Sequence, residues 1–323
     1  MKGIVFTILL FSLSLPVFSQ NVKDSIIYEN YLTPLTPART ENKKRIKLVT
    51  IANAVGYGGS LAGFYSAWYS NYPQSSFHFF DDNKEWKQVD KVGHAYGGYI
   101  SCYGTTEMWK WAGMKQRKAA VLGTISAFAY ESVIETLDGF SAEWGWSWGD
   151  IGANVFGSGL FLGQELIWGD QRIKYKFSFH KENYGAKDLN DRANYLYGQT
   201  WQERMIKDYN NQTYWLSANL KSFMPKSNLP PWLNVAFGYG ADGMFGAVEN
   251  VGKDKEGNVF DRRDIQRYRQ YYLSPDIDLT KIKTKSKSKF LKLTLGFLNA
   301  FKFPMPSLEY NSKGKFAFHL VHF

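Results

Sequence analysis

The chain has 323 residues, a formal net charge of +10 and an aromatic content of 17%, including 11 Trp and 21 Tyr. Its single cysteine, Cys102, excludes an intramolecular disulfide, so stability must come from packing. The positive charge favours anionic partners, and we expect lipid headgroups or cell-wall polymers rather than nucleic acid. Trp and Tyr are also frequent at membrane interfaces.

The first residues, MKGIVFTILLFSLSLPVFSQ, have the pattern of a secretory signal. Lys2 supplies the positive charge, residues 4–17 form an apolar run, and Ser19 is a small residue before a plausible cleavage site. We therefore expect a signal peptide at 1–19, a polar leader at 20–46 and an exported protein. Because no cysteine stands near that site, the signal does not predict a lipid-attached N-terminus.

Residues 47–169 are expected to form a Gly-rich helical domain. The stretch 48–80 contains no Asp, Glu, Lys or Arg. Its first half is long enough to span a bilayer, and a buried helical hairpin explains it nearly as well. Three more helical segments are expected at about 90–114, 117–137 and 150–168, which gives four mutually packed helices.

Residues 170–323 are expected to form a β-rich domain, so the fold class is α+β. Short aromatic segments alternate in polarity, as strands do. They lie at 172–180, 212–223, 232–241, 270–279, 306–311 and 315–323. Alternation of apolar-out and polar-in residues is typical of outer-membrane strands, but the number of strands fits a half-barrel or sandwich better than a closed barrel. His319 and His322 are three residues apart and should therefore point to opposite faces.

Residues 281–304 combine a lysine-rich run with an amphipathic, aromatic stretch. A strand would place all five lysines on one face, which suits contact with an anionic membrane surface. A solvated edge strand protected by lysines is the alternative. The membrane contacts expected here are Lys281, Lys283, Lys285, Lys287, Lys289, Phe290, Phe297 and Phe301.

Polar residues recur at helical spacing within the expected helical domain. Residues three or four apart lie on one face of a helix, and carboxylates are almost never buried singly. The stripes should therefore face each other or a cleft. They consist of Asp90 and His94; of Glu131, Glu135 and Asp138; and of Asp150 and Asn154.

Three explanations of these stripes remain open. In the first, Asp90, His94, Glu131, Glu135 and Asp138 converge on a divalent metal, and His94, Glu131 and Glu135 are catalytic. In the second, a structural network pins the helices, and Asp90 or Asp150 caps its own helix. The members of that network are Asp90, Lys91, Asp138, Asp150 and Asn154. In the third, the stripes face water.

The motifs DKVGH, ESVIETLDGFS and WGDIGANVFGSG, in this order, resemble a known family. They are similar to the YfiM-like predicted periplasmic lipoproteins and, more distantly, to VanZ-like membrane proteins. The resemblance covers about 90–163 and includes Gly157, and the β-rich remainder, with KDYNNQTYWLS at 207–217, is similar to the longer members of the same family. It implies an envelope location, in the periplasm or at the outer membrane of a Gram-negative bacterium, and no established reaction.

The sequence thus favours a membrane-associated envelope protein with a structural or binding role at the outer membrane. The expected partners are a membrane surface or anionic lipid, and other envelope proteins. The alternative is a metal-dependent hydrolase or transferase that acts on lipid or cell-wall phosphate. In that case its cofactor would be a divalent metal held near His94.

Overall fold

The computed structural model describes residues 37–67, 69, 73–253, 257–284 and 288–322. The expected signal peptide at 1–19, most of the polar leader, Lys285 and Lys287 lie outside these residues. The helices and the sheet belong to one compact unit, Leu32–Phe323.

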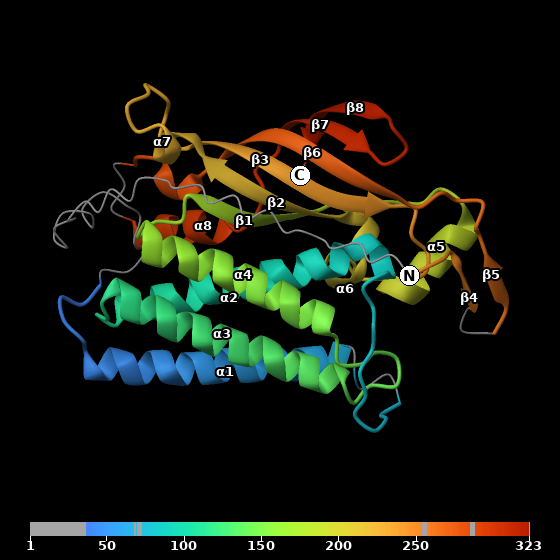
Figure 1. Cartoon of the computed structure of the whole chain (residues 1–323), viewed down its shortest axis with the longest axis horizontal. Coiled ribbons are helices and arrows are strands. Elements are labelled where there is room, and N and C mark those ends of the chain that lie inside the picture. Colours follow the sequence, from blue (N-terminus) through green and yellow to red (C-terminus); the bar gives the residue numbers. More distant parts are fainter. Residues whose placement is uncertain (1–36, 68, 70–72, 254–256, 285–287, 323) are drawn as a thin grey trace, which may run out of the picture. The chain divides into compact units, whose positions relative to one another are not determined.

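Four long helices form the N-terminal part, as the sequence predicts (Figure 1). They are α1 (Lys43–Ala67), α2 (Val89–Trp111), α3 (Gln116–Asp138) and α4 (Trp148–Ile167). The uncharged stretch 48–80 is no helical hairpin among the described residues, because α1 ends at Ala67 and residues 73–80 contain no helix. Within the described ranges, none of the helices has both the length and the hydrophobicity needed to cross a membrane.

Small residues allow α2 to pack closely against its neighbours α3 and α4. A Cβ atom at Gly157 would stand 1.9 Å from the backbone oxygen of Ala95, and one at Gly98 would stand 2.9 Å from the backbone oxygen of Asn154. On the other side, a Cβ at Gly123 of α3 would meet the Thr106 hydroxyl at 2.2 Å. These glycines set the distances at which polar side chains of the three helices can meet.

The C-terminal part is a mixed region built around one antiparallel sheet, so the α+β fold class is confirmed. All six strands of this sheet were predicted, and they run in the order β1-β2-β3-β6-β7-β8. They are β1 (Ile173–Phe179), β2 (Gln212–Asn219), β3 (Leu233–Asp242), β6 (Tyr268–Ile277), β7 (Met305–Asn311) and β8 (Phe316–His322).

Several short elements connect these strands and are not predicted by the alternation pattern. Two form a separate hairpin, β4 (Val251–Lys253) with β5 (Val259–Asp261). The helices are α5 (Lys187–Tyr197), α6 (Trp201–Lys207), α7 (Leu220–Phe223) and α8 (Lys289–Leu298). The 3-10 turns between the strands are η4 (Tyr209–Asn211) and η5 (Leu279–Lys281), and a further one, η3 (Glu85–Gln88), comes before α2.

Helix α2 joins the helical layer to the sheet. Tyr96 and Tyr99 pack their rings against Tyr175 and Phe177 of β1, with centroid separations of 5.8–6.1 Å. Figure 1 shows α1 on the side of the bundle that faces away from the sheet. A shift of α2 therefore changes both the helical packing and the contact with the sheet.

Replacing Gly157 with Ala should destabilise the protein strongly. The added Cβ clashes with backbone atoms of α2, which cannot move aside as a flexible side chain can. We expect a loss of about 2–4 kcal/mol in the free energy of unfolding, at or above the usual range for overpacking. Urea denaturation followed by circular dichroism measures it.

The matched control is Gly159→Ala on the same helix, where a Cβ would meet nothing within 4 Å. Helix propensity alone should then raise stability by up to about 1 kcal/mol. Equal effects of the two variants would contradict the close packing of α2 against α4.

Candidate functional site

A left-handed turn leads directly into α2 and positions its first polar residues. Trp86, Lys87 and Gln88 all have positive φ angles, which is uncommon for residues other than glycine. The sheet holds this turn, because the Tyr239 hydroxyl donates to the Lys87 backbone oxygen and Arg269 donates to the Gln88 side chain. The strain is therefore offset by contacts from β3 and β6.

His94 lies on α2 between carboxylates from two other helices. Its Nδ1 is 3.2 Å from Oε1 of Glu135, a side chain of α3 that is fully buried. Its Nε2 is 3.5 Å from Oδ1 of Asp150 on α4 and 3.9 Å from Oδ1 of Asp90, one turn earlier on α2. About 20% of the His94 side chain is exposed, so solvent reaches this point.

Lys91 forms ion pairs with three carboxylates beside His94. Its Nζ is 2.6 Å from Asp82, 2.7 Å from Asp150 and 3.1 Å from Asp90. We call the set of Asp82, Asp90, Lys91, His94, Glu135 and Asp150 the His94 centre.

More distant residues hold the carboxylates of this region in place. The Tyr209 hydroxyl donates to Oδ1 of Asp90 at 2.7 Å, across 119 residues of sequence. The Tyr69 hydroxyl donates to Oδ1 of Asp138 at 2.7 Å. The side-chain amide of Asn154 is 3.5 Å from Oε1 of Glu135, and no hydrogen bond within the described residues reaches Oε2 of Glu135.

Carboxyl groups outnumber basic groups around the centre. Burial opposes the charge on His94, but Asp150, Asp90, Glu135 and Glu131 outweigh it and raise the pKa of His94 to about 10. Burial also raises the pKa of Glu135 and of Glu131 above the usual glutamate value. The carboxylates are Asp82, Asp90, Glu131, Glu135, Asp138 and Asp150, and the cations are Lys91 and His94.

The structure brings together most of the residues that sequence spacing singled out, but not all in one place. Asp90, His94, Glu135 and Asp150 meet, with Lys91 beside them. Two predicted members lie to the side: Asp138 accepts its hydrogen bond from Tyr69, and Glu131 accepts one from Ser101 at 3.3 Å. The third explanation, a solvated face, is wrong because Glu131, Glu135 and Asp150 are buried.

The expectation that Asp90 or Asp150 caps its own helix is also wrong. The N-cap of α4 is Ser147, whose hydroxyl accepts from the backbone of Asp150, and that of α2 is Gln88, without a side-chain cap. Both aspartates lie within the first turn instead, so their carboxylates are free to reach Lys91.

Sequence reasoning missed Asp82, Tyr209 and Tyr69. None belongs to a helical stripe, because Asp82 precedes η3 and Tyr209 begins η4. The segment KDYNNQTYWLS contains Tyr209 and was part of the family resemblance, which was the one available signal.

The lysine-rich segment 281–304 differs from the strand expected there. Lys281 belongs to η5 and is buried, with its Nζ 3.1 Å from Asp170 and 2.8 Å from the Ser222 hydroxyl, so it is not on an exposed face. Lys283 is exposed. Lys289 begins α8, on which Phe290 and Phe297 are exposed, whereas Phe301 packs partly buried against Phe177.

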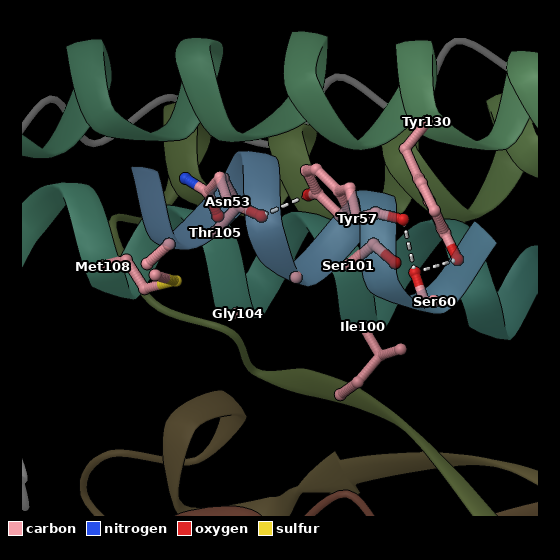
Figure 2. Close-up of a pocket in the computed structure, with 11 residues that line it drawn as sticks. Asn53, Tyr57, Ser60, Ile100, Ser101, Gly104, Thr105, Met108 and Tyr130 are labelled. Atoms are coloured by element: carbon pink, nitrogen blue, oxygen red, sulfur yellow. Dashed lines mark hydrogen bonds between the residues drawn. The ribbon is translucent and has the colours of Figure 1, made fainter. Parts of the chain in front are cut away.

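A shallow groove of about 340 Å³ lies between α1, α2 and α3 (Figure 2). Tyr57 bonds Thr105 and Ser60 bonds Tyr130 within it, so these hydroxyls satisfy one another. Ser101 lines the groove and also donates to Glu131. Glu131 thus connects the groove to the region around His94.

His94 should stay protonated far above the ordinary histidine range. Since its pKa is raised to about 10, its charge stabilises the fold fully below about pH 6.5, and this contribution disappears as the pH rises through about 10. Histidine ring NMR of the metal-free chain should show one resonance that titrates near pH 10. That resonance should be missing in His94→Gln, and a His94 midpoint near 6.5 would contradict the described charge environment.

The comparisons with known proteins concern the part of the chain that carries this centre. No curated protein and no solved structure matches the chain. A family-model match over residues 78–162 supports an exported, periplasmic envelope protein. The YfiM-like and VanZ-like resemblance stays a prediction. Lipid attachment is not carried over to this chain, whose one cysteine, Cys102, is buried in α2. Residues 78–162 match the model of a family described as "Predicted periplasmic lipoprotein (DUF2279)", and this range includes the His94 centre from Asp82 to Asp150.

Proposed function

We propose that this chain is a membrane-associated envelope protein that binds a divalent cation at the His94 centre. One observation carries the proposal: Asp90, His94 and Asp150 each offer a ligand atom, and these atoms lie within 4.8 Å of one another. Imidazole and carboxylate from facing helices are common ligands for divalent metals.

Glu135, which lies on the Nδ1 side of the His94 ring, supports the same assignment. A metal-binding histidine usually donates its other ring N–H to a carboxylate, which fixes the ring and strengthens the ligand. Nδ1 of His94 faces Oε1 of the fully buried Glu135, so Nε2 is left toward Asp90 and Asp150. Because the pKa of His94 is raised to about 10, the cation has to displace the proton on Nε2. Glu135 is therefore a positioning residue, and the excess of carboxylates favours a further positive charge.

The proposed substrate class is a phosphate group of a lipid or of a cell-wall polymer. When bound, the cation would polarise a phosphoryl oxygen. Lys91 lies in the same centre and can bind a second phosphate oxygen as a point charge. Because Lys91 also contacts Oδ1 of Asp150, it competes with the cation for that oxygen.

Membrane association is supported by α8. This helix exposes Phe290 and Phe297 next to the basic segment that precedes it, the arrangement of an amphipathic helix at a lipid interface. An outer-membrane location is part of the same proposal.

The second candidate is a non-enzymatic envelope protein in which the centre is structural. Lys91 and His94 already contact carboxylates of α2, α3, α4 and the chain before η3, so they can pin these elements without a metal. In that case His94→Ala should lower the free energy of unfolding, by about 3–5 kcal/mol if it leaves buried carboxylates unpaired, while metal content stays at background.

Metal analysis distinguishes the two candidates. After extensive dialysis and addition of Mn²⁺ or Zn²⁺, the unmutated chain should retain about one ion per chain, as expected for a single three-ligand site. His94→Ala should retain none, and Glu135→Gln should bind about 10–100-fold more weakly. Lys91→Met should bind more tightly, because it removes the competing ammonium group.

The matched control is Asp138→Asn, a carboxylate-to-amide change on α3 outside the three ligands, which should leave metal binding nearly unchanged. Background metal in the unmutated chain, with no rise in melting temperature on adding the ions, would contradict the cation site and favour the structural network.

A further inference from the structure

The large sheet is inverted relative to an ordinary water-facing sheet. Its enclosed face carries charge: Lys176 and Asp276 are both fully buried and 2.8 Å apart, and Lys174 is 2.9 Å from Asp278. The sheet curls enough for the His322 ring of β8 to contact Trp215 of β2. Water-facing antiparallel sheets normally bury their apolar face, so the opposite face needs an explanation.

That opposite face, which we call the outer face, carries a row of leucine and phenylalanine residues across the sheet, the apolar row. Strand register joins Leu216 to Phe237, Phe237 to Leu273, Leu273 to Leu308 and Leu308 to Phe318. Leu216 packs against the helical core. Beyond the helices the row is uncovered, and the exposed fractions of its other residues are 52%, 54%, 52% and 62%.

A tyrosine row lies next to the apolar row, two residues along each strand. Strand register joins Tyr214, Tyr239, Tyr271, Tyr310 and Phe316. Exposure again increases away from the helices, with Tyr214 buried and Tyr310 and Phe316 exposed. Tyrosine suits positions that are apolar on one side and wet on the other.

Basic residues follow the tyrosine row. Lys313 and Lys315 are exposed in the turn between β7 and β8, beyond the end of the tyrosine row. The Lys313 ammonium lies over the ring of Tyr268, which is three residues from Tyr271 and therefore belongs to the enclosed face, so Lys315 is the lysine left for headgroup contact. Along the strands, side chains therefore change from leucine and phenylalanine to tyrosine, with lysine at the turn. A bilayer has the same sequence of layers: acyl chains, the interface and anionic headgroups.

We propose that the outer face of β3, β6, β7 and β8 contacts a lipid bilayer that contains anionic headgroups. This inference rests on the membrane association proposed above and assigns it to the sheet in addition to α8. The apolar row contacts acyl chains, the tyrosine row lies at the interface, and Lys315 meets the headgroups. A protein partner would need no such ordering by depth, and the net charge of +10 suits an anionic surface.

The test is flotation of the full chain with vesicles of phosphatidylethanolamine and phosphatidylglycerol. The double variant Phe237→Glu/Leu308→Glu places charges on the outer face, where both side chains are exposed, so it should fold normally by circular dichroism. We expect it to lose most of the flotation of the unmutated chain. The matched control, Val259→Glu, changes an apolar residue of β5 that is still more exposed, and it should float as the unmutated chain does.

The outcomes separate this inference from the proposed function. If the double variant floats normally while Phe290→Glu/Phe297→Glu does not, the sheet contact is overturned and membrane association through α8 stands. If the unmutated chain does not float, membrane association itself fails together with the sheet contact, whereas the cation site is judged by metal content alone.

A second copy or another protein could also cover the outer face. A lipid-free dimer that the double variant converts to a monomer, with no flotation of either chain, would assign the face to a second copy and overturn the proposal. A fluorophore on Leu308→Cys should shift to the blue when vesicles are added, but one on Asp191→Cys of α5 should not. No shift at Leu308 would likewise count against lipid contact.

Discussion

The ion pairs of Lys91 and His94 are the interactions on which the arrangement of the helices depends. Carboxylates from α3, α4 and the chain before η3 meet at these two residues of α2. A buried carboxylate without a cation is very costly, so the helices must approach until the charges meet. Glycine makes that approach possible, because any Cβ at Gly157 would hold α4 away from α2. The charges of the centre can therefore pair only because small residues at the helix contact let α2 and α4 approach closely.

Helix α2 also links the His94 centre to the sheet. The buried charges of the sheet are likewise paired with opposite charges. Asp276 receives Lys176 at 2.8 Å and the Ser217 hydroxyl at 2.6 Å in the enclosed side of the sheet. Both halves of the molecule therefore keep ionic groups inside and leave much apolar surface outside. Apolar surface is costly in water and favourable beside lipid. The buried ionic groups and the exposed apolar surface together therefore support a membrane location for the proposed cation site better than either does alone.

Helical spacing was enough to predict that Asp90 shares a helix face with His94, and Glu131 with Glu135, because the 3.6-residue period brings residues four apart together. It left open whether these faces point inward or to water. It could not predict Asp82 or Tyr209, whose contacts depend on chain geometry outside the helices. The alternation of apolar and polar residues predicted the six strands of the large sheet. It could not predict which face is enclosed, because a period of two separates the two faces without saying which one is buried. It also failed for His319 and His322: a shift in the pairing of β7 with β8 inserts an extra residue, and their rings lie 5.3 Å apart. The regular spacing of the lysines predicted a strand with all five on one face. That prediction was wrong for Lys281, which lies in a 3-10 turn and pairs with Asp170.

The left-handed turn before α2 has a consequence for folding. Its partners Tyr239 and Arg269 lie 152 and 181 residues further along the chain, and Asp90 receives its hydrogen bond from Tyr209. Contacts of such long sequence separation form slowly, because a long loop must close before they are gained. For a chain that crosses a membrane from its N-terminus, the helices would be delivered first and would wait for β3 and β6. The His94 centre would then be among the last parts to take its final shape, and its carboxylates would remain hydrated until the sheet has formed.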